Sequence, residues 1–197
     1  MHCHIVAARR AARHAALIIM YYYAAMLSFF QALDNLVATR LAPHSPTLRF
    51  LFAQLTHLAG IYFISIAGVC SVLYFAVNGS YTFALGFIVA LGGSMLVALS
   101  LKRVFMRERP TDPLIRENGH ALPSGHAACS FAFYGYCSYL LMKLWPSPLS
   151  FFIVILLALL VLAIGFSRVY LRVHHTSDVL LGYFIGAIFL TLAIVFF

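Results

Sequence analysis

The segment "LSFFIVILLALLVLAIGFS" (149–167) decides the fold class, because it is uncharged and almost entirely apolar. A helix needs about 20 apolar residues to cross the hydrocarbon core of a bilayer. Five other segments have the same character, and the six predicted spans cover residues 15–36, 55–77, 81–101, 125–145, 149–167 and 178–197. These segments do not alternate polar and apolar residues, as membrane β-strands do. The sequence therefore predicts an all-α membrane bundle with six transmembrane helices.

The composition leaves little sequence outside these spans. Of 197 residues, 63% are hydrophobic and only 9% are charged, and the mean hydropathy is +0.96. We therefore expect residues 1–197 to form a single membrane-embedded domain. The first apolar segment follows Arg9, Arg10 and Arg13, as in a secretory signal peptide. It is too long for a signal peptide and lacks a clean cleavage site, so we expect a retained helix.

Cysteine and histidine spacing gives no indication of a disulfide framework or a metal site. The four cysteines have no paired spacing, and three of them lie in predicted spans. The sequence "HCH" (2–4) is better explained as a frayed terminus than as a set of metal ligands.

Alternation of the spans across the membrane places the polar loops together. Loops 37–54, 102–124 and 168–177 fall on one side, and the termini and the tight connections at 78–80 and 143–150 fall on the other. The first of these loops contains two prolines, and we expect it to include an interfacial helix. The three polar or basic clusters described next therefore face one compartment.

The first cluster is "KRVFMRERP" (102–110), in which Lys102 and Arg109 are seven residues apart. Two helical turns would place both side chains on one face, with Pro110 ending the helix. An alternative is that these cations anchor the helix end at the membrane interface.

The second cluster is "LPSGH" (122–126), where a polar turn enters an apolar run. The amides that open a helix favour an anion, and Gly125 and Ser124 can contribute a backbone N–H and a hydroxyl. A simple N-cap explains Ser124 equally well. It does not explain His126, an ionisable side chain at the start of a predicted span.

The third cluster is "SRVYLRVHHTSD" (167–178), in which His174 and Asp178 stand at i and i+4. On a helix Asp178 would accept from one ring nitrogen of His174, which leaves the other nitrogen as a nucleophile or base. Arg168 lies six residues before His174. An alternative role for Asp178 is to cap a helix N-terminus.

Together, the clusters place cations, two imidazoles and a carboxylate at one membrane face, a combination suited to phosphoryl transfer. The net charge of +8 is compatible with nucleic acid binding in principle. The basic residues lie in short loops beside predicted spans, however, which favours lipid headgroups or phosphorylated substrates and no nucleic acid.

The three clusters resemble the tripartite signature of the type-2 phosphatidic acid phosphatase (lipid phosphate phosphatase) superfamily. That signature is Lys, six residues and Arg-Pro; then Pro-Ser-Gly-His; then Ser-Arg, five residues, His, three residues and Asp. The sequence fills it with Lys102, Arg109-Pro110, Pro123-Ser124-Gly125-His126, Ser167-Arg168, His174 and Asp178. The short chain and its six predicted spans are similar to small bacterial members of the family.

The resemblance implies a role for each signature residue. His174 would form a phosphohistidine and be oriented by Asp178, and His126 would protonate the leaving group. The phosphate would be held by Lys102, Arg109, Ser124, Gly125 and Arg168. No metal or other cofactor is implied. The substrate would be a membrane lipid phosphate or diphosphate, such as phosphatidate, phosphatidylglycerol phosphate, undecaprenyl diphosphate or lipid A 1-phosphate.

Alternatives to this function are an anion or lipid transporter that uses the same basic site, a vanadium-dependent haloperoxidase and a non-catalytic scaffold. The paired imidazoles argue against the first, the apolar spans against the second and the complete signature against the third. The sequence does not specify the oligomeric state, the physiological lipid or roles for His120, His175 and the additional arginines.

Membrane orientation receives conflicting signals. The arginines before the first span favour a cytoplasmic amino terminus, which places the motifs outside. Yet the motif side carries nine of the thirteen Lys and Arg residues. We expect the motifs to face outward, because the chain resembles bacterial members of the family that have this arrangement. The active site would then lie at the periplasmic or exterior face of a bacterial inner membrane.

Overall fold

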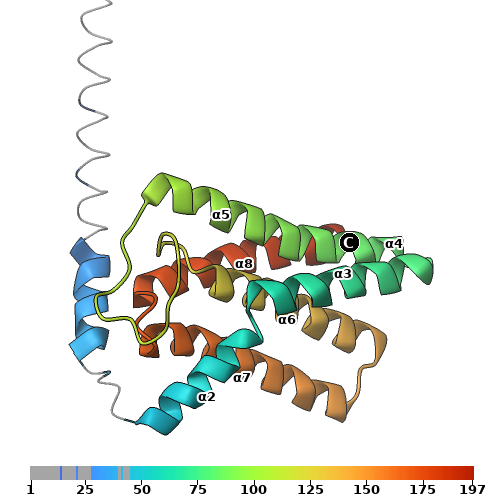
Figure 1. Cartoon of the computed structure of the whole chain (residues 1–197). Helices are drawn as coiled ribbons and strands as arrows, with labels where there is room; N and C mark the ends of the chain where they lie inside the picture. Colours follow the sequence, from blue (N-terminus) through green and yellow to red (C-terminus); the bar gives the residue numbers. More distant parts are fainter. Residues whose placement is uncertain (1–13, 15–20, 22–27, 40, 42–44) are drawn as a thin grey trace, which may run out of the picture. The chain divides into compact units, whose positions relative to one another are not determined.

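The computed structural model describes residues 14, 21, 28–39, 41 and 45–197 (Figure 1). The chain divides into two compact units, residues 1–41 and 42–197. In the first unit residues 28–39 are helical. Most of the first predicted span, the arginines that precede it and the "HCH" sequence lie outside the described residues.

The regular structure described in the second unit is helical throughout, which confirms the predicted all-α class for this part of the chain. Its elements are α2 (Pro46–His57), α3 (Ile61–Val77), α4 (Tyr81–Phe87), the π-helix η1 (Ile88–Gly93), α5 (Ser94–Phe105), α6 (Gly125–Leu144), α7 (Pro148–Tyr170) and α8 (Thr176–Phe196). The three described cysteines, Cys70, Cys129 and Cys137, are free thiols.

Four helical segments of the described chain are long and apolar enough to cross a membrane: Pro46–Val77, Tyr81–Phe105, Pro148–Tyr170 and Thr176–Phe196. They match the second, third, fifth and sixth predicted spans. The fourth prediction coincides with α6, which is 20 residues long but contains more polar residues than the other four. Because α6 packs against α3, α5, α7 and α8, protein rather than lipid surrounds much of its surface. A total of six transmembrane helices stays a prediction.

The second predicted span begins later than expected. Residues 55–57 belong to α2, and α3 starts only at Ile61, after the break at residues 58–60. Helix α2 itself begins after Ser45, whose side chain accepts from the Leu48 amide at 3.4 Å, with Pro46 at the first helical position. This helix confirms that the 37–54 loop leads into a further helix. Its location at a membrane interface stays a prediction.

The closest helix packing lies between α6 and α8, at Gly182 and Gly186 of α8. A Cβ atom on Gly182 would lie 2.5 Å from the Ser124 carbonyl oxygen, and one on Gly186 would lie 2.6 Å from that of Ala128. Both distances are below a van der Waals contact, so only glycine permits this approach. The Gly-x-x-x-Gly spacing therefore fixes the start of α6 against the start of α8.

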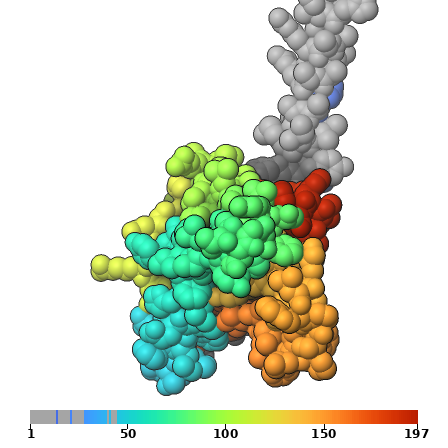
Figure 2. All heavy atoms as spheres, turned by 90° about the vertical axis from the view of Figure 1, so that its right-hand side faces the viewer, coloured from blue at the N-terminus to red at the C-terminus, as the bar shows by residue number. Residues whose placement is uncertain are grey.

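The polar loops of the second unit gather at one end of its helices, as the alternation predicted (Figure 1). The Leu114 amide donates to the Leu171 carbonyl at 3.0 Å, and the Ser124 amide donates to the Asp178 carbonyl at 2.9 Å. From α2, Arg49 Nη2 donates to the Leu114 carbonyl at 2.5 Å. The α3–α4 and α6–α7 connections lie at the opposite end, which Figure 2 views.

Candidate active site

A cavity of about 370 Å³ opens among α3, α5, the 106–124 loop, the start of α6 and the α7–α8 connection. Its lining has two parts. The apolar part consists of side chains around the start of α3 and along α5: Ala59, Ile61, Ile64, Met95, Ala98 and Leu99. The polar part includes Lys102, Arg109, Glu117, Gly125, His126 and His174. The cavity thus has a charged region at one part of its lining and an apolar wall, formed by α3 and α5, at the other.

His174 lies in the α7–α8 connection and is 2% exposed. Arg172 adopts a positive φ of 55°, and the amides of Val173 and His174 both donate to the Arg168 carbonyl at 3.2 Å. This tight turn brings the imidazole back toward the bundle. Nδ1 of His174 lies 3.6 Å from Oδ2 of Asp178, and Nε2 lies 3.4 Å from Nη1 of Arg109.

The predicted pairing of His174 with Asp178 is confirmed as a close approach, but the expected cause was wrong. Helix α8 begins only at Thr176, with His175 as its N-cap, so His174 is not on the helix. Asp178 also caps the helix, because its Oδ2 accepts from the His175 amide at 2.8 Å. The catalytic and capping interpretations of Asp178 are therefore compatible.

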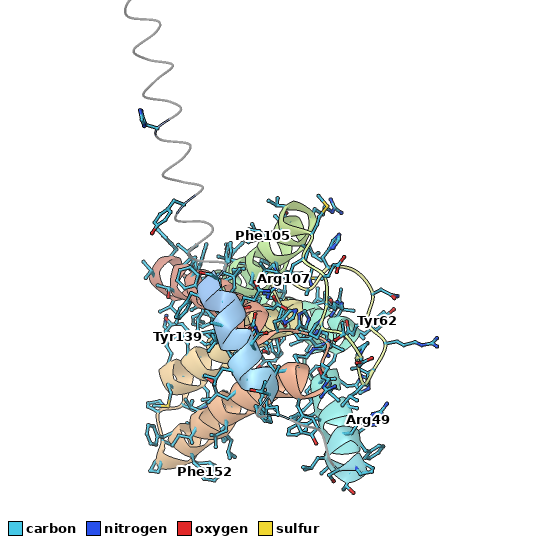
Figure 3. All side chains as sticks on the ribbon, turned by 90° about the vertical axis from the view of Figure 1, so that its left-hand side faces the viewer. Arg49, Tyr62, Phe105, Arg107, Tyr139 and Phe152 are labelled. Atoms are coloured by element: carbon cyan, nitrogen blue, oxygen red, sulfur yellow. The ribbon has the colours of Figure 1, made fainter. Side chains whose placement is uncertain are left out.

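A second partner holds the Asp178 carboxylate, which is fully buried. Nη1 of Arg107 donates to Asp178 Oδ1 at 2.8 Å and to Ser177 Oγ at 2.7 Å. Figure 3 shows Arg107 at the loop end of the bundle. The sequence alone left Arg107, one of the additional arginines, without a role. Its position identifies it as the cation that neutralises the carboxylate behind His174.

The environment of His174 favours a neutral imidazole. Burial lowers the pKa of His174 to about 4, although the hydrogen-bonding influence of Asp178 acts in the opposite direction. A carboxylate can only accept, so Asp178 favours the tautomer with its proton on Nδ1. Nε2, on the side of Arg109 and the cavity, then carries the lone pair.

Arg109 lies in a loop, and the prediction that it shares a helical face with Lys102 was wrong. Helix α5 ends at Phe105, and Met106 leaves it with a φ of 43°. Nevertheless, both side chains reach the cavity. Nζ of Lys102 donates to the His120 carbonyl at 2.6 Å, which ties the end of α5 to the far part of the loop.

The Arg109 guanidinium binds three backbone carbonyls. Its Nε, Nη2 and Nη1 donate to the carbonyls of Gly119, Asn118 and Val173 at 2.9, 2.9 and 2.7 Å. These bonds join the 106–124 loop to the α7–α8 connection. Burial lowers the pKa of Arg109, and the nearby carboxylates of Glu117 and Asp178 offset part of that effect.

The Pro-Ser-Gly-His sequence forms the start of α6. Ser124 is fully buried, and its Oγ accepts from the Ala127 amide at 3.4 Å, as an N-cap does. Gly125 and His126 line the cavity, and a Cβ added at Gly125 would meet open space. Contact of Ser124 with a bound phosphate stays a prediction.

Arg168 is fully buried behind the cavity wall. Its Nη1 donates to Thr56 Oγ1 at 2.7 Å, and its Nη2 donates to the Glu117 carboxylate. Glu117 also lies 3.6 Å from Arg109 Nη2. Burial alone would raise the pKa of Glu117, but the charge and hydrogen bond of Arg168 outweigh it, so that pKa lies below its usual value.

The structure therefore brings all eight predicted site residues to one end of the bundle, in two shells. Lys102, Arg109, Gly125, His126 and His174 line the cavity, and Ser124, Arg168 and Asp178 are buried behind it. Sequence reasoning missed Glu117 and Thr56. Glu117 had one detectable signal, since it is one of only five acidic residues and lies between two basic clusters.

Comparison with known proteins identifies the family. The family model of the PAP2 superfamily matches residues 83–197, more than half of the chain, and this region contains every residue of the three clusters. The chain belongs to the PAP2 superfamily.

Two matches from Bacillus subtilis resemble the chain more specifically. Phosphatidylglycerophosphatase B of Bacillus subtilis (strain 168) is 33% identical over 102 residues, which cover 50% of each chain. The chain thus aligns with half the length of this curated relative. The crystal structure of a transmembrane PAP2 type phosphatidylglycerolphosphate phosphatase from Bacillus subtilis matches with a TM-score of 0.74 and 28% identity, covering 87% of this chain and 86% of that one.

A third match extends the comparison of the fold. The crystal structure of Aquifex aeolicus LpxE matches with a TM-score of 0.59 and 22% identity, covering 85% of this chain and 93% of that one. The helical architecture is therefore shared with two solved bacterial structures.

Proposed function

We propose that this chain is an integral membrane phosphatase that hydrolyses a phosphomonoester or diphosphate on a lipid through a phosphohistidine intermediate. The observation that carries the proposal is the environment of His174. One ring nitrogen is directed at a buried carboxylate, and the other lies beside Arg109 at a cavity that also contains Lys102 and His126. The similarity to phosphatidylglycerophosphate phosphatase of Bacillus subtilis, in sequence and in structure, supports a phosphatase of this class.

The proposed reaction has two steps. In the first, the His174 Nε2 lone pair attacks phosphorus, the bond from phosphorus to the lipid oxygen breaks, and His126 donates a proton to that oxygen. In the second, water attacks phosphorus, His126 takes a proton from this water, and the phosphorus–nitrogen bond breaks. Inorganic phosphate and neutral His174 result. Lys102, Arg109 and Arg168 stabilise the charge on the non-bridging oxygens, with Ser124 and the Gly125 amide as further donors.

The cavity walls support a lipid rather than a soluble substrate. Its apolar residues lie around the start of α3 and along α5, so acyl chains can remain among helices while the phosphate reaches the polar residues. Exposure of each methylene to water would cost about 0.8 kcal/mol. We therefore propose sideways entry from the bilayer. Candidate substrates are phosphatidate, phosphatidylglycerol phosphate, undecaprenyl diphosphate and lipid A 1-phosphate.

Rapid-quench trapping tests the proposed intermediate. Purified protein is mixed with a lipid whose terminal phosphate carries ³²P, and the label on protein is measured after alkaline quench, in which phosphohistidine survives. We expect transient label in the wild type and none in His174→Ala. Hydrolysis without any labelled protein would contradict the covalent mechanism. Specific lipid binding with no phosphate release from the whole lipid panel would favour the transporter alternative.

Substrate access is tested by kcat/KM for a long-chain lipid in mixed micelles and for its water-soluble deacylated analogue. We expect the lipid to be the better substrate, because the bilayer confines its phosphate near the cavity. Equal values would exclude the proposed entry route. Activity should also persist in EDTA and be inhibited by vanadate, which mimics five-coordinate phosphorus.

We further propose that the site faces the periplasm or exterior of a bacterial inner membrane. Arg116 is exposed in the 106–124 loop and provides a reporter position. Arg116→Cys, in a background that lacks the four native cysteines, should react with a membrane-impermeant maleimide in whole cells. Reaction only after lysis would place the active site in the cytoplasm.

A further inference from the structure

Glu117 occupies the position between two cations that are proposed to hold the phosphate. Its carboxylate accepts a hydrogen bond from Arg168 Nη2 and lies 3.6 Å from Arg109 Nη2. The residue also lines the cavity together with Lys102, His126 and His174. A carboxylate and a phosphate oxygen are alternative acceptors for the same guanidinium donors. Glu117 is therefore bound where a substrate phosphate would bind.

Arg168 has a second side-chain partner besides the Glu117 carboxylate. Thr56 Oγ1 accepts from the other terminal nitrogen of this guanidinium at 2.7 Å. The Glu117 side chain is 25% exposed, whereas that of Arg168 is fully buried. Of the two side chains, Glu117 is therefore the one with room to move into the cavity opening, and Arg168 retains its bond to Thr56 when it does.

The other buried carboxylate of the site does not share this arrangement. Asp178 is bound by Arg107 and by the His175 amide, on the far side of His174. Of the two, only Glu117 lines the cavity. Its single negative charge lies near Lys102 and Arg109 at the cavity and is paired with Arg168 behind it, and it reduces the net positive charge that an incoming anion meets.

We infer that Glu117 is an internal competitor of phosphate, which leaves Arg168 and Arg109 when a phosphoryl group binds and returns when inorganic phosphate departs. This inference rests on the phosphatase activity proposed above. Three cations around a doubly charged product would retain it, and a carboxylate that rebinds the same donors favours its release. Glu117 thus sets the affinity of the site for anions and limits product inhibition.

The test compares inorganic phosphate binding by the purified wild type with Glu117→Gln and Glu117→Ala, by isothermal titration calorimetry at fixed ionic strength. Both variants remove the charge. Asp112→Asn is the matched control, since it removes an exposed charge from the same loop. We expect phosphate to bind both Glu117 variants ~10-fold more tightly than the wild type, with the control unchanged. KM for the lipid should fall in parallel, without a rise in kcat.

Unchanged or weaker phosphate binding in folded Glu117 variants would overturn the inference, and weaker binding would identify Glu117 as a residue that positions Arg168. The melting temperature of each variant verifies folding, and two substitutions ensure that a defect in one leaves the other for comparison. If the wild type hydrolyses lipid phosphates but the variants bind phosphate as it does, only the inference fails. If the wild type neither hydrolyses them nor binds phosphate, the proposed function fails as well.

Discussion

The α7–α8 connection and the 106–124 loop both supply residues to one cavity and are built differently. The connection spans only five residues, 171–175, and is fixed by backbone hydrogen bonds to Arg168 and by the cap of α8. The loop is far longer and contains no helix. It is held largely by side chains, since Lys102 and Arg109 donate to the carbonyls of residues 118–120.

This difference means that the proposed catalytic residues are held rigidly, whereas the cavity opening has more room to adjust. His174 and Asp178 are 2% and 0% exposed and sit between packed helices, which suits residues whose geometry decides reactivity. Glu117 belongs to the longer loop, and its side chain is 25% exposed, so it has more room to move than these two residues. The two regions should therefore respond differently to substitution: the connection in kcat, and the loop in anion affinity.

The largest effect is expected from His174→Ala in the α7–α8 connection. Removal of the attacking nitrogen should lower kcat by at least ~1,000-fold, while the protein remains folded. Phosphate release from the preferred lipid measures kcat, and the melting temperature in detergent measures whether the protein remains folded. Turnover within tenfold of the wild type would show that another residue is the nucleophile.

Two glycine substitutions test the cavity and the helix packing behind it separately. Gly125→Ala places a methyl group in open space, so folding should be preserved while kcat/KM falls by roughly 10–100-fold through obstruction of the phosphate position. Gly182→Ala places a methyl group 2.5 Å from the Ser124 carbonyl oxygen and should lower the melting temperature as well. Equal melting temperatures for the two variants would show that the α6–α8 contact can relax.

Asp178→Asn tests whether the carboxylate only orients His174. We expect a kcat lower by about 10–100-fold, a smaller loss than for His174→Ala, because the attacking nitrogen remains. Arg107→Ala removes the partner of the carboxylate and should reduce kcat by less. A loss in Asp178→Asn equal to that in His174→Ala would mean that the carboxylate is indispensable to the chemical step.

The smallest effects are expected at two residues with positive φ, one in each region. Arg172 has a φ of 55° in the connection, and Asp112 has a φ of 56° in the loop. Glycine adopts this conformation without strain, so Arg172→Gly should stabilise the protein by up to about 1 kcal/mol. Asp112→Gly should gain less, since aspartate tolerates this region better. Denaturation midpoints in matched micelles provide the comparison.

The sequence predicted the composition of the site better than its local geometry. The fixed spacings of His126, His174 and Asp178 matched the signature of the family, and the resemblance implied a role for each of them. The helical argument for Arg109 failed since Met106 ends α5 in a left-handed conformation, which methionine does not signal. Glu117 escaped notice because its partners Arg168 and Thr56 are 51 and 61 positions away, a proximity that only the tertiary fold creates.

The fold shows a similar division. Apolar length located α3, α7 and α8, because lipid contact imposes a hydrophobic surface. The same criterion is weaker for α6, where Ser130 is fully buried among protein neighbours. The break between α2 and α3 was also not predicted from the sequence. Gly60 lies beside an apolar run, and a single glycine there is a weak signal for a turn.

The π-helical turn η1 connects α4 to α5 within one long helix. It can be regarded as the insertion of one extra residue into an otherwise continuous α-helix. Each residue of an α-helix advances the side-chain direction by about 100°. Deletion of one residue from Ile88–Gly93 would restore uniform winding and turn the following segment by that angle. Met95, Ala98, Leu99 and Lys102, which now line the cavity, would then be directed elsewhere. A single inserted residue thus aligns this wall and its lysine with His174, the proposed nucleophile, which comes from a distant part of the chain.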